Sequence, residues 1–209
     1  MRTKTLLVTA ALSAVGLSTT MAQNVFSVNA VGFVNVPLPA KLSLIANPLK
    51  AASNTIKDLF AGVADGTTVY KYDGAAFSIN TLDLGDWSDP TQTLLPGEGA
   101  FVRNPGAAAT VTFVGEVMQG DLSNPIDGPN KLSIRSSQVP QSGKLVVDLG
   151  FPAVDGDTVY QYNNAAGAYV IHTLDLGEWS EGEPVIGVGE AFFVRKVDKS
   201  DWKRKFSVN

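Results

Sequence analysis

The chain has 209 residues, no cysteine, one histidine and a formal net charge of -4 at pH 7. The absence of cysteine excludes disulfides, thiolate chemistry and cysteine-based zinc sites. The acidic balance argues against nucleic-acid binding, because nothing offsets repulsion from the phosphates.

The N-terminal segment has the pattern of a signal peptide. A basic start precedes an apolar run over residues 6–17, and the small residues Thr20 and Ala22 follow. This order is typical of secretory signals, and the run is too short to cross a bilayer. We expect residues 1–22 to be removed on export, which makes the mature chain periplasmic, cell-surface or extracellular; the alternative is a buried N-terminal helix. No later segment predicts a membrane span.

The first half of the mature chain predicts a series of short strands. β-Branched, aromatic and alternating apolar residues favour strands over residues 33–36, 42–45, 67–72, 77–82, 100–103 and 110–114. Asp73 and Gly74 are a hairpin signal between two of these strands. Residues 55–61 have the spacing of one short amphipathic helix, with Gly62 as its stop.

The second half predicts the same kinds of element. Strands are expected over residues 158–162 and 169–174, joined by a longer turn, and residues 145–149 correspond to the short helix. An interior strand does not tolerate proline, so we expect prolines to mark loops. The prolines concerned are Pro48, Pro90, Pro96, Pro105 and Pro125.

The two halves repeat each other. Four blocks recur in the same order, at an offset of 90 and then 92 residues: 41–44 with 131–134, 65–72 with 155–162, 81–88 with 173–180, and 97–103 with 189–195. A weaker match joins 26–29 to 206–209 and indicates a strand at both ends. We expect an all-β protein of two homologous sandwich- or barrel-like modules, residues 25–116 and 117–209, each with at most one short helix.

Three motifs carry a resemblance to a known family. They are residues 42–48 (LSLIANP), 69–72 (VYKY) and 96–102 (PGEGAFV). In this order they resemble a largely uncharacterised family of secreted bacterial tandem-repeat β modules. The second half keeps the last two motifs, at 159–162 and 188–194, but departs from the first at 135–140. The resemblance implies an exported, often surface-associated protein, and it supplies no catalytic residues.

Polar residues recur in both halves and permit two interpretations. They are Asp83 and Asp175, Asp86 and Glu178, Glu98 and Glu190, and Arg103 and Arg195. A carboxylate pair suits a glycoside hydrolase. Aspartates in the Asp-Leu-Gly-Asp turn also bond the local backbone, and this interpretation is favoured because both copies are equally preserved. Glu98 and Arg103 face each other or lie apart, and a structural role is favoured over a binding role.

Aromatic residues offer a sugar-binding alternative. Trp87 and Trp179, placed on loops, with Tyr72 and Tyr162 form candidate stacking platforms. Alternation sends Tyr70 and Tyr72 to one face of a strand, and core packing is the favoured interpretation there.

Histidine and metal chemistry have little support. His172 lacks a neighbouring nucleophile signature, so we expect a half-exposed strand residue. Residues 83–86 and 155–157 place carboxylates in glycine-containing turns that suit Ca²⁺, although neither has EF-hand spacing. We expect no metal site and no cofactor, with Ca²⁺ as the open exception.

Three functions follow, in decreasing order of support. The first is a non-catalytic exported protein with a structural, surface-assembly or adhesion role. The second is a carbohydrate-binding module that uses the tryptophans and tyrosines, and the third is a carboxylate-dependent hydrolase. The expected partners are cell-surface or extracellular proteins or glycans.

Overall fold

The computed structural model describes residues 30–208, which are almost entirely strands and turns. In this range one helix is present, α1, with four residues, Ile56–Leu59. The prediction of an all-β fold with at most one short helix per half is confirmed. The predicted signal peptide and the predicted strand at 26–29 lie outside the described residues.

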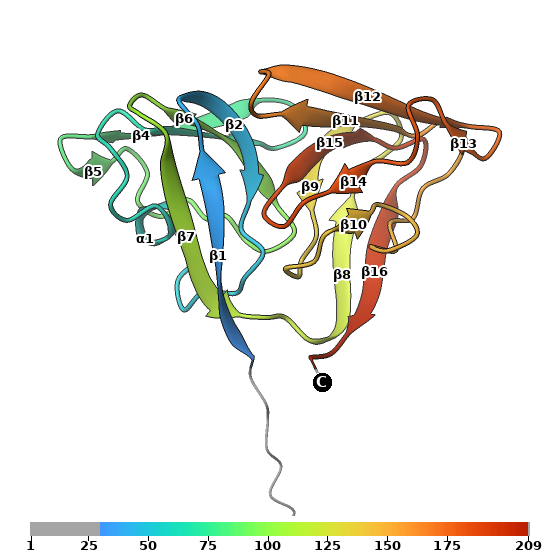
Figure 1. Cartoon of the computed structure of the whole chain (residues 1–209), viewed down its shortest axis with the longest axis horizontal. Coiled ribbons are helices and arrows are strands. Elements are labelled where there is room, and N and C mark those ends of the chain that lie inside the picture. The colour runs from blue at the N-terminus through green and yellow to red at the C-terminus, as the bar shows by residue number, and fades with distance from the viewer. Residues whose placement is uncertain (1–29, 209) are drawn as a thin grey trace, which may run out of the picture.

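Five antiparallel strands of the first half form one sheet (Figure 1). Their order across the sheet is β2 (Lys41–Ala46), β6 (Gly99–Asn104), β3 (Thr68–Tyr72), β4 (Phe77–Asp83) and β5 (Asp86–Trp87). The predicted hairpin joins β3 to β4. Asp73 Oδ1 accepts hydrogen bonds from the backbone N–H groups of Ala75 and Ala76, at 2.9 and 2.8 Å. Gly74 has a φ of 99°, which glycine adopts at no steric cost.

Five strands of the second half form a sheet with the same topology. The strands that correspond in turn to those of the first sheet are β9 (Leu132–Ser136), β15 (Ala191–Arg195), β11 (Thr158–Asn163), β12 (Ala168–Asp175) and β13 (Glu178–Trp179). Asn163 takes the place of Asp73 in the hairpin turn, and its Oδ1 accepts from the backbone N–H groups of Ala165 and Ala166. The origin of the halves as copies of one module stays a prediction.

A two-stranded ribbon from the same half covers one face of each sheet. The ribbons pair β1 (Val31–Leu38) with β7 (Ala109–Glu116), and β8 (Gly120–Ile126) with β16 (Ser200–Phe206). A third, minor ribbon pairs β10 (Gly143–Lys144) with β14 (Val185–Ile186). Within residues 30–208 none of these sheets closes into a barrel, so the architecture is sandwich-like. The predicted boundary at 116/117 falls between β7 and β8.

Each sheet and its ribbon enclose an apolar core. In the first half the Phe60 ring contacts the rings of Trp87 and Phe113 edge-on, with centroids 6.2 and 6.0 Å apart. In the second half Phe151 contacts Trp202 at 5.2 Å, and the Trp202 indole N–H donates to the carbonyl of Leu149. Burial of such side chains is the main driving force for folding.

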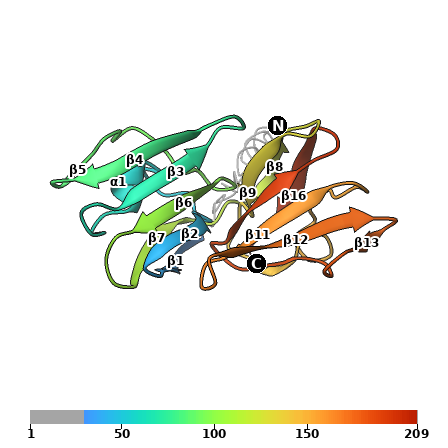
Figure 2. The ribbon, with the colours of Figure 1, turned by 90° about the horizontal axis from the view of Figure 1, so that it is seen from above.

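Part of the other face of each sheet packs against the opposite half, whereas Ile79 on β4 and Ile171 on β12 stay exposed (Figure 2). Alternation along β2 shows why: Leu44 and Ala46 belong to the cluster between the halves, whereas Ile45 belongs to the core of its own half. Successive strand residues point to opposite faces, so an apolar run such as 44–46 supplies both surfaces.

Two local expectations are corrected. Pro125 lies inside β8, opposite Asp201, and not in a loop. β8 has only one partner strand, so the missing N–H breaks no ladder on its open edge. The segment 145–149 forms a turn instead of the expected short helix, with the N–H groups of Asp148 and Leu149 both donating to the carbonyl of Lys144.

Candidate functional site

Asp83 and Asp86 lie opposite each other at the base of a tight turn between β4 and β5. The turn residues Leu84 and Gly85 both have positive φ, 49° and 88°, as in the type I′ turns that close hairpins. Their N–H groups donate to the Asp65 carboxylate at 2.9 and 3.0 Å. The carboxylate that holds this turn therefore belongs to Asp65, whereas the sequence interpretation assigned that role to Asp83 and Asp86.

The second half repeats this turn. Asp175 and Glu178 lie opposite each other, and Leu176 and Gly177 have φ values of 50° and 81°. The Gly177 N–H donates to the carboxylate of Asp155 at 2.9 Å. We call residues 83–86 and 175–178 the leucine tips.

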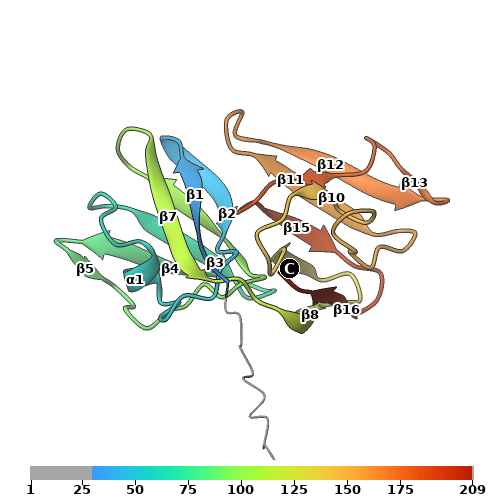
Figure 3. The same cartoon turned by 60° about the horizontal axis from the view of Figure 1, so that its bottom comes forward.

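The leucine of each tip is exposed and strained. Leu84 is 89% exposed and Leu176 is 87% exposed. A left-handed backbone costs a residue with a Cβ about 1–2 kcal/mol, and a bulky side chain there is a true outlier. β5 and β13, which flank the tips, lie at opposite ends of the molecule (Figure 3). Both halves thus present an apolar side chain in an unfavourable conformation at their far ends.

The tryptophans lie in strands, which corrects their expected place on loops. Trp87 belongs to β5 and pairs with Leu82, and only 7% of it is exposed. Trp179 belongs to β13, is half-buried and packs against the core of the second half. The buried Trp87 ring has no free face on which a sugar could stack.

Tyr72 and Tyr162 belong to a cluster of six rings that joins the halves. Tyr72 lies 5.9 Å from Phe193, and Tyr162 lies 5.2 Å from Phe101. Phe101 and Phe193 contact each other at 5.9 Å in the centre. Phe77 and Tyr169 pack at the two outer positions, each about half-exposed. The two tyrosines therefore serve packing between halves, with their edges reaching two clefts described below.

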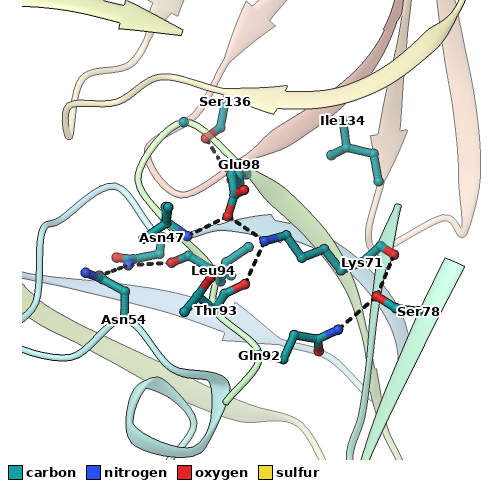
Figure 4. A network of polar contacts seen from close by, with 12 residues as sticks. Asn47, Asn54, Lys71, Ser78, Gln92, Thr93, Leu94, Glu98, Ile134 and Ser136 are labelled. Carbon is teal, nitrogen blue, oxygen red and sulfur yellow. Dashed lines mark hydrogen bonds and ion pairs between the residues drawn. The ribbon is translucent and has the colours of Figure 1, made fainter. Parts of the chain in front are cut away.

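Glu98 closes the turn that precedes β6. Its Oε2 accepts from the N–H of Leu95 and from the Lys71 ammonium, both at 2.7 Å (Figure 4). Lys71 also donates to the carbonyl of Thr93 at 2.8 Å. Glu98 therefore anchors β3 to the turn, and its ion pair is with Lys71.

Glu190 has the same role in the second half. Its Oε2 accepts from the Gly187 N–H, and its Oε1 accepts from the side chain of Gln161, both at 2.8 Å. Gln161 also donates to the carbonyl of Val185. The neutral Gln161 takes the position that the charged Lys71 has in the first half.

Arg103 and Arg195 lie apart from these glutamates. Both arginines are exposed and lie near the C-terminal ends of β6 and β15, whereas Glu98 and Glu190 precede these strands. Arg103 lies opposite Leu42 and Thr68, and Arg195 lies opposite Leu132 and Thr158. The structure therefore does not bring Glu98 and Arg103 together.

Backbone hydrogen bonds join the halves reciprocally. The N–H of Ser136 donates to the carbonyl of Gly97 at 3.0 Å, and that of Ala46 donates to the carbonyl of Gly189 at 2.8 Å. Ser136 and Ala46 end equivalent strands, and Gly97 and Gly189 precede equivalent strands. Asn124 adds a further bond to the Gly97 carbonyl at 2.9 Å. The halves are thus related by an approximate two-fold axis.

A polar cleft of about 290 Å³ lies where the β3–β4 hairpin meets the second half. The residues that line it are Lys71, Tyr72, Asp73, Gly74, Ser78, Glu98, Asp127, Ser133 and Arg135. The Arg135 guanidinium donates to the carbonyls of Pro125 and Ile134, at 2.6 and 2.8 Å. Burial lowers the pKa of Arg135, and the charges of Asp127 and Glu98 oppose that shift. Two backbone N–H groups lower the pKa of Asp73.

An apolar cleft of about 670 Å³ lies at the matching place on the other side of the axis. The β11–β12 hairpin meets β1 there, and the wall includes Val36, Pro37, Tyr162, Val170 and Val188. Val170 occupies the position of Ser78. The two clefts thus share a backbone arrangement and differ in chemistry.

Two of the carboxylates considered for calcium, those of Asp155 and Asp157, have partners within the chain. Asp157 is fully buried and forms an ion pair with Lys196, which also donates to the carbonyl of Pro152. The Val154 and Val197 N–H groups donate to the same carboxylate. Asp155 holds the leucine tip. These contacts give both aspartates a role in the fold, and Ca²⁺ binding stays a prediction.

His172 is buried, which corrects its expected half-exposure. Only 6% of it is accessible, and its Nδ1 lies 2.9 Å from the carbonyl oxygen of Gly182. Asn80 takes its place in the first half and bonds Ser88 and Asp89. Both residues therefore tie β4 or β12 to the loop that follows.

Several site residues were missed from the sequence, including Asp65, Lys71 and Arg135. The sequence feature that could have indicated Lys71 and Arg135 is a difference between the halves, because Gln161 and Ile45 occupy the equivalent positions.

Comparison of the chain with family models, curated proteins and solved structures gives no match. No helix among residues 30–208 has the length and apolar character needed to cross a membrane.

Proposed function

We propose that this chain is an exported, non-catalytic protein that bridges components of a cell surface through its two leucine tips. The observation that carries the proposal is the retention, in both halves, of an exposed leucine in a left-handed turn. Asparagine or glycine would suit that backbone better. A residue kept in both halves against local stability supports a role in binding.

The connection between the halves supports bridging. Six aromatic rings and reciprocal backbone bonds join the two sheets, so the spacing between the tips is held by the fold. A rigid bivalent molecule gains avidity only for partners whose spacing matches its own. This suits a repetitive surface layer or an extracellular assembly.

The chemistry of the tips indicates the partner surface. Each leucine lies between two exposed carboxylates, Asp83 and Asp86 in one half and Asp175 and Glu178 in the other. An apolar side chain flanked by negative charges suits a protein surface with an apolar pocket and a cationic rim. The carboxylates considered for hydrolysis serve turns or lie at these tips, which supports a non-catalytic role.

The test compares surface retention of four full-length proteins in producing cells that lack their own copy. They are the wild type, Leu84→Asn, Leu176→Asn and the double variant. We expect the wild type in the cell-surface fraction, the double variant in the medium and the single variants in between. Val147→Asn is the matched control, since Val147 is 73% exposed and belongs to neither tip. Retention of the double variant at the wild-type level would overturn the proposal.

A further inference from the structure

We propose that the polar cleft is a binding site for a neutral polyhydroxylated ligand, one or two sugar units in size. The proposal goes beyond surface bridging, because it concerns a small ligand at the axis and not a protein at the tips. The cleft volume of about 290 Å³ lies at the small end of ligand pockets, which suits a ligand of this size.

The cationic groups of the cleft are held in place before any ligand binds. Lys71 is fixed by Glu98 and the Thr93 carbonyl, and Arg135 is fixed by the carbonyls of Pro125 and Ile134. Because their side chains are already ordered, binding would cost less conformational entropy than at flexible surface residues. Such preorganisation is a property of binding sites.

Ser133 lines the cleft, with its hydroxyl oxygen buried beneath the surface. Only 2% of the residue is exposed, and its Oγ has no hydrogen-bond partner among the described residues. A buried hydroxyl without a partner is unfavourable unless a ligand or water satisfies it. Ser43, at the matching position of β2, also has no partner, but it does not line the apolar cleft. Ser133 therefore differs from Ser43 in that it belongs to the wall of a cleft.

The charge pattern selects the ligand class. Two cations, Lys71 and Arg135, lie with three carboxylates, those of Asp73, Glu98 and Asp127. An anionic ligand would meet the carboxylates, and a cationic ligand would meet the cations, so either leaves unfavourable contacts. Sugar hydroxyls both donate and accept, which matches the mixture. The edge of the Tyr72 ring adds an apolar contact beside these polar groups.

The apolar cleft shows that this polar lining is not required by the fold. The residues equivalent to Lys71 and Ser78 are Gln161 and Val170 of the second half, and the residue equivalent to Arg135 is Ile45 of the first half. The order of strands and the backbone bonds of Ala46 and Ser136 are matched, although the turn of the second hairpin is longer and its Asn164 bonds the backbone of Leu44. Lys71, Ser78 and Arg135 are thus specific to the polar cleft, whereas Asp73 and Glu98 have polar equivalents, Asn163 and Glu190, in the other cleft. The equivalent residues of the first three supply substitutions that the fold tolerates.

The experiment is an amide NMR titration of the full-length protein with glucose, galactose, mannose and N-acetylglucosamine. We expect at least one sugar to cause saturable shifts confined to the polar cleft. Lys71→Gln and Arg135→Ile should each weaken its binding about tenfold or more, as expected when a hydrogen bond to a charged group is lost. Gln161→Lys in the apolar cleft is the control and should leave binding unchanged, as should the double leucine-tip variant.

Three results would overturn the proposal. The first is the absence of saturable shifts with all four sugars. The second is unchanged sugar binding by the Lys71→Gln, Arg135→Ile double variant with a dispersed, folded spectrum. The third is tighter binding of inorganic phosphate than of any sugar at this cleft. Because the leucine-tip variants are scored separately, failure here is distinguishable from failure of the bridging role.

Discussion

Gly99 and Ala191 occupy the same place in the two halves and face each other where the sheets meet. A Cβ built on Gly99 would lie 2.3 Å from the Cβ of Ala191 and 2.5 Å from Cγ2 of Ile134. Real side chains do not approach so closely, so the axis has room for one methyl group and not for two.

Gly99→Ala should therefore destabilise the protein by about 1–3 kcal/mol through overpacking. Adding Ala191→Gly should recover much of that loss, because the methyl group then comes from the other half. Urea unfolding of both variants measures the free energy of unfolding. Equal stability of Gly99→Ala and the double variant would contradict this account of the axis.

Replacing Leu84 with asparagine should stabilise the protein, by up to about 1 kcal/mol, because asparagine tolerates the left-handed backbone of the turn. Thermal unfolding of Leu84→Asn and Leu176→Asn measures the gain, and the two should be additive because the tips lie far apart. Val147→Asn, at an exposed position without positive φ, should change stability little. A loss of stability at either tip would show that the leucines stabilise the fold.

Phe101→Ala should cost about 3–5 kcal/mol, as is usual for a buried phenylalanine. Phe101 is only 7% exposed and contacts Tyr162 and Phe193 of the other half. The same change should separate thermal unfolding into two transitions, one for each half, in calorimetry. Phe77→Ala, at a half-exposed ring of the same cluster, should cost less and keep a single transition.

Asp157 and Lys196 form a buried ion pair where the first half has Thr67 and Asn104. Asp157→Asn should cost about 3–5 kcal/mol, because it leaves the Lys196 ammonium buried without its partner. Asp157→Thr combined with Lys196→Asn, which copies the first half, should be more stable than either single variant. Urea unfolding of this double-mutant cycle measures the coupling, and additive losses would contradict it.

Asp73 should make stability depend on pH in the acid range. Backbone N–H groups of Ala76 and Ala75 lower its pKa in the folded state below the unfolded value of about 3.9. The stabilisation is therefore fully present above the unfolded pKa and is lost as pH falls through the folded pKa. Asp73→Asn should remove this contribution, since Asn163 makes the same two bonds without titrating. Urea midpoints between pH 2 and 6 would show it, and identical pH profiles would count against it.

The strands and the helix were predictable because their residue patterns lie within short segments of the sequence. Alternation placed β3 and β4 and their hairpin correctly, and the i, i+3, i+4 spacing located α1. The contacts of Tyr72 with Phe193 were not predictable, because they depend on how two distant sheets pack. Trp87 and His172 were misjudged for the same reason: exposure is set by neighbours far away in the sequence.

The polar cleft could not be predicted from the sequence for a different reason. Lys71 and Arg135 lie 64 positions apart in the sequence, in different halves; Lys71 is the residue of the 69–72 motif that differs between the halves, and Arg135 lies where the second half departs from the first motif. Only the approximate two-fold packing brings them together. A comparison of the two halves, position by position, would have marked both as places where the chemistry changes while the pattern of strands does not.

β1 begins at Val31 and β16 ends at Phe206 on the same side of the molecule, away from the five-stranded sheets (Figure 1). A protein immobilised near Val31 or Phe206 would be attached on the side of the molecule that lies away from the five-stranded sheets. The leucine tips, beside β5 and β13, would then extend to the two sides of the molecule (Figure 1). Orientation on a sensor chip or a particle can therefore be chosen without blocking the leucine tips.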